Sequence, residues 1–176
     1  NDPAEIVEIN ARPYKVTEYY IDGIIKNIKS QFEQIGLSAQ DKELIHEAFE
    51  SFHSNKPCIK EGVMRVASIL ICDIIERQNT FKDDLEFEKK GILVFLPGLH
   101  EIFEFIEFMK DFYPLQWLTN HIDMIPLHSS LSQEEQDRAF NTAAMMKGKR
   151  KCIVSTNIAE SSITIPDIKY VLDFML

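Results

Sequence analysis

The stretch Gly91-Ile92-Leu93-Val94-Phe95-Leu96-Pro97-Gly98 decides the fold of this chain. Its first six residues are uncharged and mostly apolar, which is typical of a strand that is buried on both faces. Pro97 and Gly98 then end the strand. We interpret them as a tight exit from it, with a ligand contact as the alternative. The amphipathic segment 99–113 that follows predicts a helix lying on the sheet.

Short apolar runs and helical segments keep alternating from there to the end of the sequence. Strands are predicted over 123–127, 152–155 and 169–173, and a shorter helix over 133–140. Ser132-Gln133-Glu134-Glu135 reads as a capping box that starts this shorter helix. Such alternation is the pattern of βαβ units, so the predicted fold class is α/β, with a parallel sheet flanked by helices.

The first half of the chain has another pattern. Lys15–Ile21 is rich in β-branched and aromatic residues and is followed by Asp22-Gly23, which predicts a strand closed by a turn. Apolar residues at helical spacing predict that the segment from Ile24 to about His53 is helical, with an N-cap at Ser38, and that a second helix runs over 61–78.

A polar, acidic linker is predicted over 79–90, after the second helix. The segment 24–90 as a whole is interpreted as a helical insertion. Within the predicted domain 1–176, such insertions more often bind proteins or brace their neighbours than catalyse.

Charge and composition exclude several classes of protein. The 176 residues carry 19 basic and 28 acidic side chains, a net charge of −9, which argues against a broad basic surface for nucleic acid. The basic run Lys147–Lys151 still permits a local contact. No apolar stretch is long enough for a membrane span, and Asn1-Asp2-Pro3 does not resemble a signal peptide. Because the sequence starts without Met, we expect it to be a fragment of a longer protein.

Cysteine and histidine spacing predicts no metal site. Cys58, Cys72 and Cys152 are odd in number and far apart, so we expect reduced, buried thiols. His46, His53, His100 and His121 form no ligand pattern either. The aromatic residues of 99–113 are most simply interpreted as core.

Ligands of an open α/β sheet bind at the carboxyl ends of its strands, and polar residues follow the predicted strands there. The chain carries Leu127-His128-Ser129-Ser130-Leu131-Ser132 after one strand and Ser155-Thr156-Asn157 at the end of another. A strand that ends in short polar side chains can contact a phosphodiester backbone without reading its sequence. The alternatives are a strand, a polar turn and a strand over 155–165, and a packing role for His128.

Several of these segments together resemble the DEAH/DExH-box RNA helicases of superfamily 2, in the half called the second RecA-like domain. Motif IV of that family resembles 92–98, motif IVa resembles 126–132, and motif V resembles 155–165. Ala11–Val16 is similar to the segment that opens the domain. Within the family, 157–162 and 166–174 are most similar to the tudor-domain-containing germline helicases of the Spindle-E type.

The resemblance implies roles for individual residues. It implies that Thr156 and Asn157 contact RNA, with Ser129 and His128 next, and that Thr164 lies near the nucleotide. Pro166 stands where many family members carry an Asp that meets the ribose. Asp167, one residue later, is a candidate nucleotide contact, and whether it substitutes for that Asp is left open. No catalytic residue and no metal ligand is predicted in this chain.

Motifs that the chain lacks limit what it does by itself. It contains no phosphate-binding Gly-x-x-x-x-Gly-Lys-Ser/Thr loop and no Asp-Glu-x-His, and it stops before the arginine-bearing motif VI. ATP and Mg²⁺ are therefore expected to bind mostly to the first RecA-like domain of the full-length protein, and the chain alone is expected to be inactive.

Two functions follow from the resemblance. The first is the second motor domain of an ATP-dependent RNA helicase in germline piRNA silencing. Its expected partners are RNA, the first RecA-like domain and a germline granule protein, without a membrane, in cytoplasmic perinuclear granules. The second is a non-catalytic protein-binding module that recruits a partner. An intact phosphate loop, Asp-Glu-x-His and motif VI elsewhere in the parent would favour the first.

Overall fold

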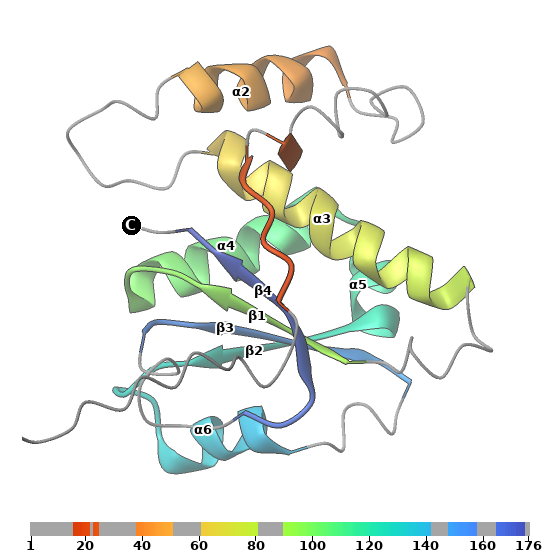
Figure 1. The fold of residues 1–176 in the computed structure, drawn as a ribbon. Coiled ribbons are helices and arrows are strands. Elements are labelled where there is room, and N and C mark those ends of the chain that lie inside the picture. The colour runs from red at the N-terminus through yellow and green to blue at the C-terminus, as the bar shows by residue number, and fades with distance from the viewer. Residues whose placement is uncertain are drawn as a thin grey trace, which may run out of the picture. The chain divides into compact units, whose positions relative to one another are not determined.

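The computed structural model divides the chain into two compact units, 1–37 and 38–176. In the first unit the structure describes residues 16–21 and 23–24. In the second it describes 38–50, 61–80, 90–141, 148–157 and 165–174. The elements named below all belong to the second unit (Figure 1).

A parallel sheet of four strands forms the middle of this unit. The strands are β1 (Gly91–Phe95), β2 (Ile122–Leu127), β3 (Arg150–Ser155) and β4 (Ile168–Asp173). They lie in the order β2-β3-β1-β4, and every neighbouring pair is parallel. All carboxyl ends therefore meet at one edge of the sheet, which we call the carboxyl edge, and all amino ends meet at the opposite edge.

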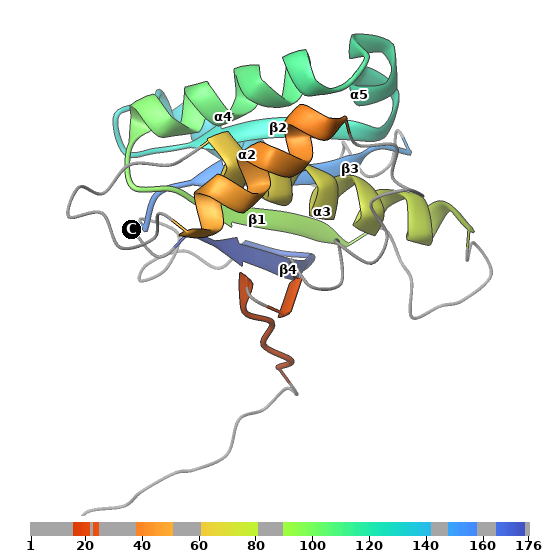
Figure 2. The same ribbon diagram turned by 90° about the horizontal axis from the view of Figure 1, so that it is seen from above.

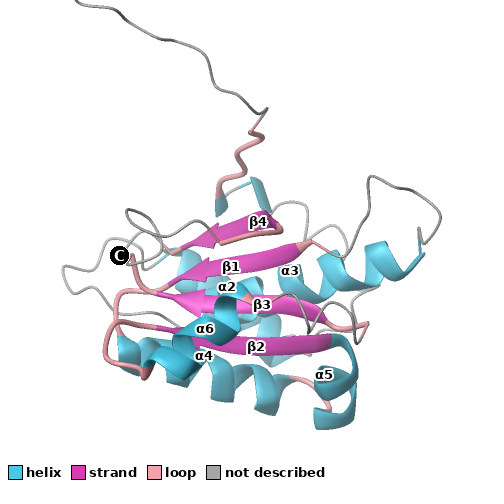
Figure 3. Ribbon diagram, turned by 90° about the horizontal axis from the view of Figure 1, so that it is seen from below, coloured by secondary structure: helices cyan, strands magenta, loops and turns pink. Residues whose placement is uncertain are grey.

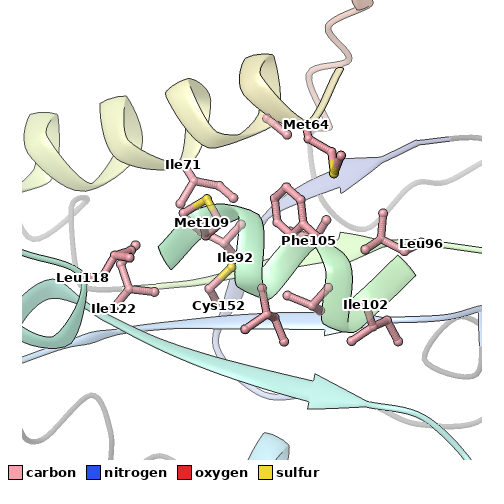
Figure 4. Packing of buried hydrophobic residues seen from close by; sticks show 14 of the residues in the cluster. Met64, Ile71, Ile92, Leu96, Ile102, Phe105, Met109, Leu118, Ile122 and Cys152 are labelled. Carbon is pink, nitrogen blue, oxygen red and sulfur yellow. The ribbon is translucent and has the colours of Figure 1, made fainter. Parts of the chain in front are cut away.

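One face of the sheet is covered by α3 (Glu61–Thr80), α4 (Leu99–Phe112) and α5 (Leu115–His121), as Figure 2 shows. Alternate residues of the two central strands, such as Ile92 and Cys152, point into this layer, because successive side chains of a strand face opposite sides. There they pack with Ile71 of α3 and with Phe105 and Met109 of α4 (Figure 4). This cluster is the larger of the two cores.

The other face is covered, among the described residues, by α6 (Gln133–Phe140) alone (Figure 3). Its core is small and consists of five buried side chains. They are Leu93, Ile125, Leu127, Ala139 and Ile153. The α/β class with helices on both faces of a parallel sheet is thus confirmed.

α2 (Ala39–Glu50) packs on the side of α3 that faces away from the sheet (Figures 1 and 2). Ile45 of α2 is fully buried, and so is Ser68 of α3, whose hydroxyl donates to the carbonyl oxygen of Met64. α3 is therefore covered on more than its sheet side, and Ile69 and Cys72 are buried as well. None of the helices among the described residues is long and apolar enough to cross a membrane.

Most predicted elements are confirmed within two residues at each end, including α3, all four strands, α4 and α6. The strand predicted over Lys15–Ile21 is wrong. Residues 16–20 are in neither a strand nor a helix, and a helical turn begins at Ile21, where Ile24 N–H donates to the carbonyl of Tyr20. Strand composition alone does not make a strand, because a strand also needs a pairing partner.

Candidate nucleic-acid interface

The carboxyl edge brings the two predicted polar loops together. Leu127 at the end of β2 is the register partner of Ser155 at the end of β3, so the loop 128–132 and the residues Thr156 and Asn157 leave the sheet side by side. Neighbouring strands lie about 4.8 Å apart. The structure thus places His128 and Ser129 close to Thr156 and Asn157.

The loop after β2 is fixed by its own hydrogen bonds. The backbone N–H of Ser130 donates to Nδ1 of His128 at 3.1 Å, and the Ser130 hydroxyl lies 2.7 Å from the same nitrogen. Because Nδ1 accepts the N–H bond, the neutral ring carries its hydrogen on Nε2, which is left as a donor. His128 can therefore shape the loop through Nδ1 and still offer Nε2 to a ligand, so its packing role and its contact role are compatible.

The same loop starts α6 through the predicted capping box. Oγ of Ser132 accepts from the N–H of Glu135 at 3.3 Å, and the Glu135 carboxylate accepts from the N–H of Ser132 at 2.9 Å. Hydrogen bonds from the Ser132 side chain and backbone hold the pKa of Glu135 below its usual value. The capping box is confirmed, and it fixes where the loop ends.

The end of β3 exposes its polar side chains unequally. Ser155 is fully buried and donates from its hydroxyl to the carbonyl of Thr156 at 2.8 Å. Thr156 itself is only 6% exposed, whereas Asn157 is exposed. Ser129 is exposed as well. Of the four predicted RNA contacts, Asn157 and Ser129 therefore present exposed side chains, whereas His128 is half-buried and Thr156 is buried.

Asp167 lies at the other edge of the sheet, just before β4. Its carbonyl accepts from the N–H of Gly91 at 2.6 Å, and its carboxylate lies 3.6 Å from Nζ of Lys90. The backbone there has φ 66°, a left-handed conformation that Asp tolerates better than most residues. The structure thus separates Asp167 from Thr156 and Asn157 by the length of a strand. Thr164, the other predicted nucleotide contact, lies outside the described residues.

The basic run before β3 is only in part a surface feature. Arg150 is buried, and its guanidinium donates to the carbonyl of Lys90. Burial lowers the Arg150 pKa to about 10. Lys151 is fully buried, and its Nζ donates to the carbonyl of Ala139 at 2.9 Å. Burial lowers the Lys151 pKa, and the charge of Asp167 opposes that shift. Two of the cations expected for a local RNA contact are thus used inside the fold.

Two of the three cysteines are described, and both are the buried free thiols that were expected. Burial raises the pKa of Cys72 and of Cys152 to about 12 each. The pKa of Tyr113, which shares a hydrogen bond with Cys72, is also raised, chiefly by burial. Cys58 lies outside the described residues.

The described residues do not fit a bound magnesium ion. No group of three His, Cys, Asp or Glu side chains among them could hold a metal, and the Asp167 carboxylate already faces Lys90.

Sequence reasoning missed Lys151 as a residue of interest, because a charge run is usually a solvated surface. The available signal was its place, directly before the apolar run Cys152–Val154.

The known proteins and the family that are similar to this chain are helicases. The model of the helicase conserved C-terminal domain matches residues 74–176, more than half of the chain. ATP-dependent RNA helicase TDRD9 of Homo sapiens is 36% identical over 183 residues, covering 99% of this chain and 11% of that protein. The probable ATP-dependent RNA helicase spindle-E of Aedes aegypti is 33% identical over 181 residues, covering 98% and 11%.

The chain therefore spans 11% of the length of these two curated relatives. Among solved structures, the crystal structure of the E. coli DExH-box NTPase HrpB is similar at 29% identity and a TM-score of 0.41. That similarity covers 57% of this chain and 11% of the HrpB chain.

Proposed function

This chain belongs to the helicase conserved C-terminal domain family, and from that premise we propose that it is the second motor domain of an ATP-dependent RNA helicase. In this proposal the carboxyl edge of the sheet holds the RNA backbone through Asn157, Thr156, Ser129 and His128. The observation that carries it is the pairing of Leu127 with Ser155, which brings the two polar loops together.

The chemistry of this edge supports contact with phosphate and sugar rather than with base edges. Its side chains are short amides, hydroxyls and an imidazole, which donate hydrogen bonds to phosphate and carry little information about sequence. Such a contact fits a chain of net charge −9, because it needs no broad basic surface.

We infer that the full-length protein uses ATP, because its relatives are named ATP-dependent RNA helicases. ATP and Mg²⁺ would be held mostly by the first RecA-like domain of the same protein, since this sequence contains no Gly-x-x-x-x-Gly-Lys-Ser/Thr loop and no Asp-Glu-x-His. Thr164 and Asp167 stay predictions as nucleotide contacts. We derive no step of hydrolysis from this chain.

The pathway we propose is germline piRNA silencing, with a germline granule protein as partner, in cytoplasmic perinuclear granules. Its support is the similarity to spindle-E and TDRD9 over almost the whole chain. Imaging of the tagged full-length protein in germ cells, with sequencing of small RNAs after its depletion, tests this. A diffuse distribution and unchanged piRNA levels would contradict it.

RNA-stimulated ATP hydrolysis by the full-length protein tests the motor function. The variant Thr156→Ala, Asn157→Ala is expected to weaken RNA stimulation by roughly tenfold, chiefly because the exposed amide of Asn157 is lost. The loss should be equal for RNAs of different sequence.

The chain offers a control of matched composition in Thr119 and Asn120, exposed consecutive residues of α5 near the amino edge. Thr119→Ala, Asn120→Ala should leave stimulation unchanged. Equal loss in both variants would contradict an RNA contact at 156–157. An absence of turnover in the unaltered protein would instead favour the protein-binding module.

A further inference from the structure

We propose that Lys151 is a positioning residue for the RNA contact: by bonding the carboxyl-terminal end of α6 to β3, it holds the loop 128–132 beside Asn157. The inference rests on the proposed function of the carboxyl edge. It assigns to a buried lysine a role that does not involve touching RNA.

Among the residues that the structure describes, few buried contacts hold α6 on the sheet. All eight residues of α6 are described, and Ala139 is the only one that is buried. Gln136 and Phe140 are half-buried, and the other residues of α6 are exposed. Arg138 lies 3.6 Å from Asp123 in a pair whose side chains are 58% and 31% exposed. A helix with one small buried residue gains little from apolar burial. Its position therefore depends on its polar contacts.

Within the described part of the chain, Lys151 makes the fully buried polar contact of α6. The last carbonyls of a helix have no partner within the helix, and the carbonyl of Ala139 is one of them. Nζ of Lys151 donates to it at 2.9 Å. The carbonyl of Arg138, near the same end of α6, accepts from the N–H of Asn141. A cation at this end of a helix is also favoured by the helix dipole.

The contact links both halves of the interface through short, ordered segments. Lys151 is the second residue of β3, and the same strand ends at Ser155, directly before Thr156 and Asn157. α6 begins at the capping box of Ser132, and the loop 128–132 ends there. Fixing the far end of α6 on β3 therefore fixes the near end of α6, and with it the loop.

RNA affinity of the full-length protein, measured against salt with a mixed-sequence single-stranded oligonucleotide, tests the inference. Lys151→Met keeps the length of the side chain but removes the donor. We expect affinity to fall roughly tenfold, as for a lost buried hydrogen bond. The dependence of log affinity on log salt should not change, whereas a lost phosphate contact would reduce its slope by about 0.7.

The control is Arg138→Met, which removes the same charge from the same end of α6 at an exposed pair. It should weaken affinity by less than about fivefold. A reduced salt slope in Lys151→Met would overturn the proposal in favour of direct RNA contact. Affinity of Lys151→Met no lower than that of Arg138→Met would overturn it as well.

Hydrogen exchange separates this inference from the proposed function. In Lys151→Met the amides of 129–131 and 137–140 should exchange faster even if the unaltered protein binds no RNA, a result that would refute the RNA contact alone. If Lys151→Met does not fold, amide exchange in the unaltered protein tests the inference instead. Its amides at 137–140 should be protected together with β3, and exchange at the rate of an unprotected peptide would overturn the inference.

Discussion

Gly91 shows how one residue controls the packing of two strands. A Cβ atom at this position would lie 2.8 Å from Cδ1 of Ile168, and 3.4 Å from the carbonyl oxygens of Asp167 and Lys151. The register between β1 and β4 shifts here, between Gly91 and Ile92. A glycine within a strand often marks such a close approach of another backbone.

Gly91→Ala is therefore expected to destabilise the chain by about 1–3 kcal/mol, the usual cost of inserting a methyl group into a packed site. Urea unfolding measures the change. Gly23→Ala is the control, because a Cβ atom there meets nothing within 4 Å. Equal stability of Gly91→Ala and the unaltered chain would show that Ile168 moves aside freely.

At this scale the sequence predicted local features well and buried charges badly. Ser132 and Glu135 were recognised as a capping box because their three-residue spacing alone defines the motif. Lys151 was not recognised, because its burial depends on α6 lying over β3, which no local pattern records.

The short helix α6 is the element on which the candidate interface depends most. Its first turn is held by the hydroxyl of Ser132 and the carboxylate of Glu135. Ser132→Ala removes that hydroxyl. The pKa of Glu135 should then rise toward its usual value, because the Ser132 hydrogen bonds are the main cause of its depression.

NMR titration of the Glu135 carboxyl checks this prediction, together with exchange of its amide, which should become roughly fivefold faster. Ser129→Ala, a change to an exposed serine in the same loop, should alter neither quantity. A Glu135 pKa that does not rise at all in Ser132→Ala would show that the hydroxyl is not the main cause, and would leave the backbone N–H of residue 132 as the next candidate.

Helices and strands were predicted correctly where their apolar pattern was long enough to recognise within the segment itself. α3, α4 and the strands carried clear apolar periodicity. α5 was missed, since seven residues after Pro114 give too short a pattern. The strand at Lys15–Ile21 was wrongly predicted, because pairing depends on partners elsewhere in the chain.

The two buried thiols should make the domain less stable in alkali. Cys72 and Cys152 keep their protons in the folded state up to a pKa of about 12, against an ordinary value of 9.0. The unfolded chain releases these protons first. Their contribution to stability is therefore complete below pH 9 and is lost as the pH rises from 9 to 12.

Each thiol should lower the free energy of unfolding by at most about 1.4 kcal/mol per pH unit within that range. Urea unfolding between pH 8 and 11 measures the slope, and Cys72→Ala, Cys152→Ala should reduce it. A slope that is the same in the variant and in the unaltered chain would assign the alkaline loss to other groups, such as Tyr113.

The order β2-β3-β1-β4 is the feature of the whole molecule that the sequence did not predict. Strand order depends on which crossover each connection takes, and periodicity contains no information about it. The order matters for the site, because it places β2 beside β3 and thereby brings His128 near Asn157.

The burial of two thiols makes the domain suitable for fluorescence labelling. Maleimide dyes react with thiolates, and a thiol with a pKa near 12 supplies almost none at neutral pH. With Cys58 replaced by Ser, Asn157→Cys would therefore take up a single dye at the carboxyl edge. If the full-length protein has the first motor domain that we propose, a second dye there would let energy transfer test, molecule by molecule, whether the two domains move relative to each other.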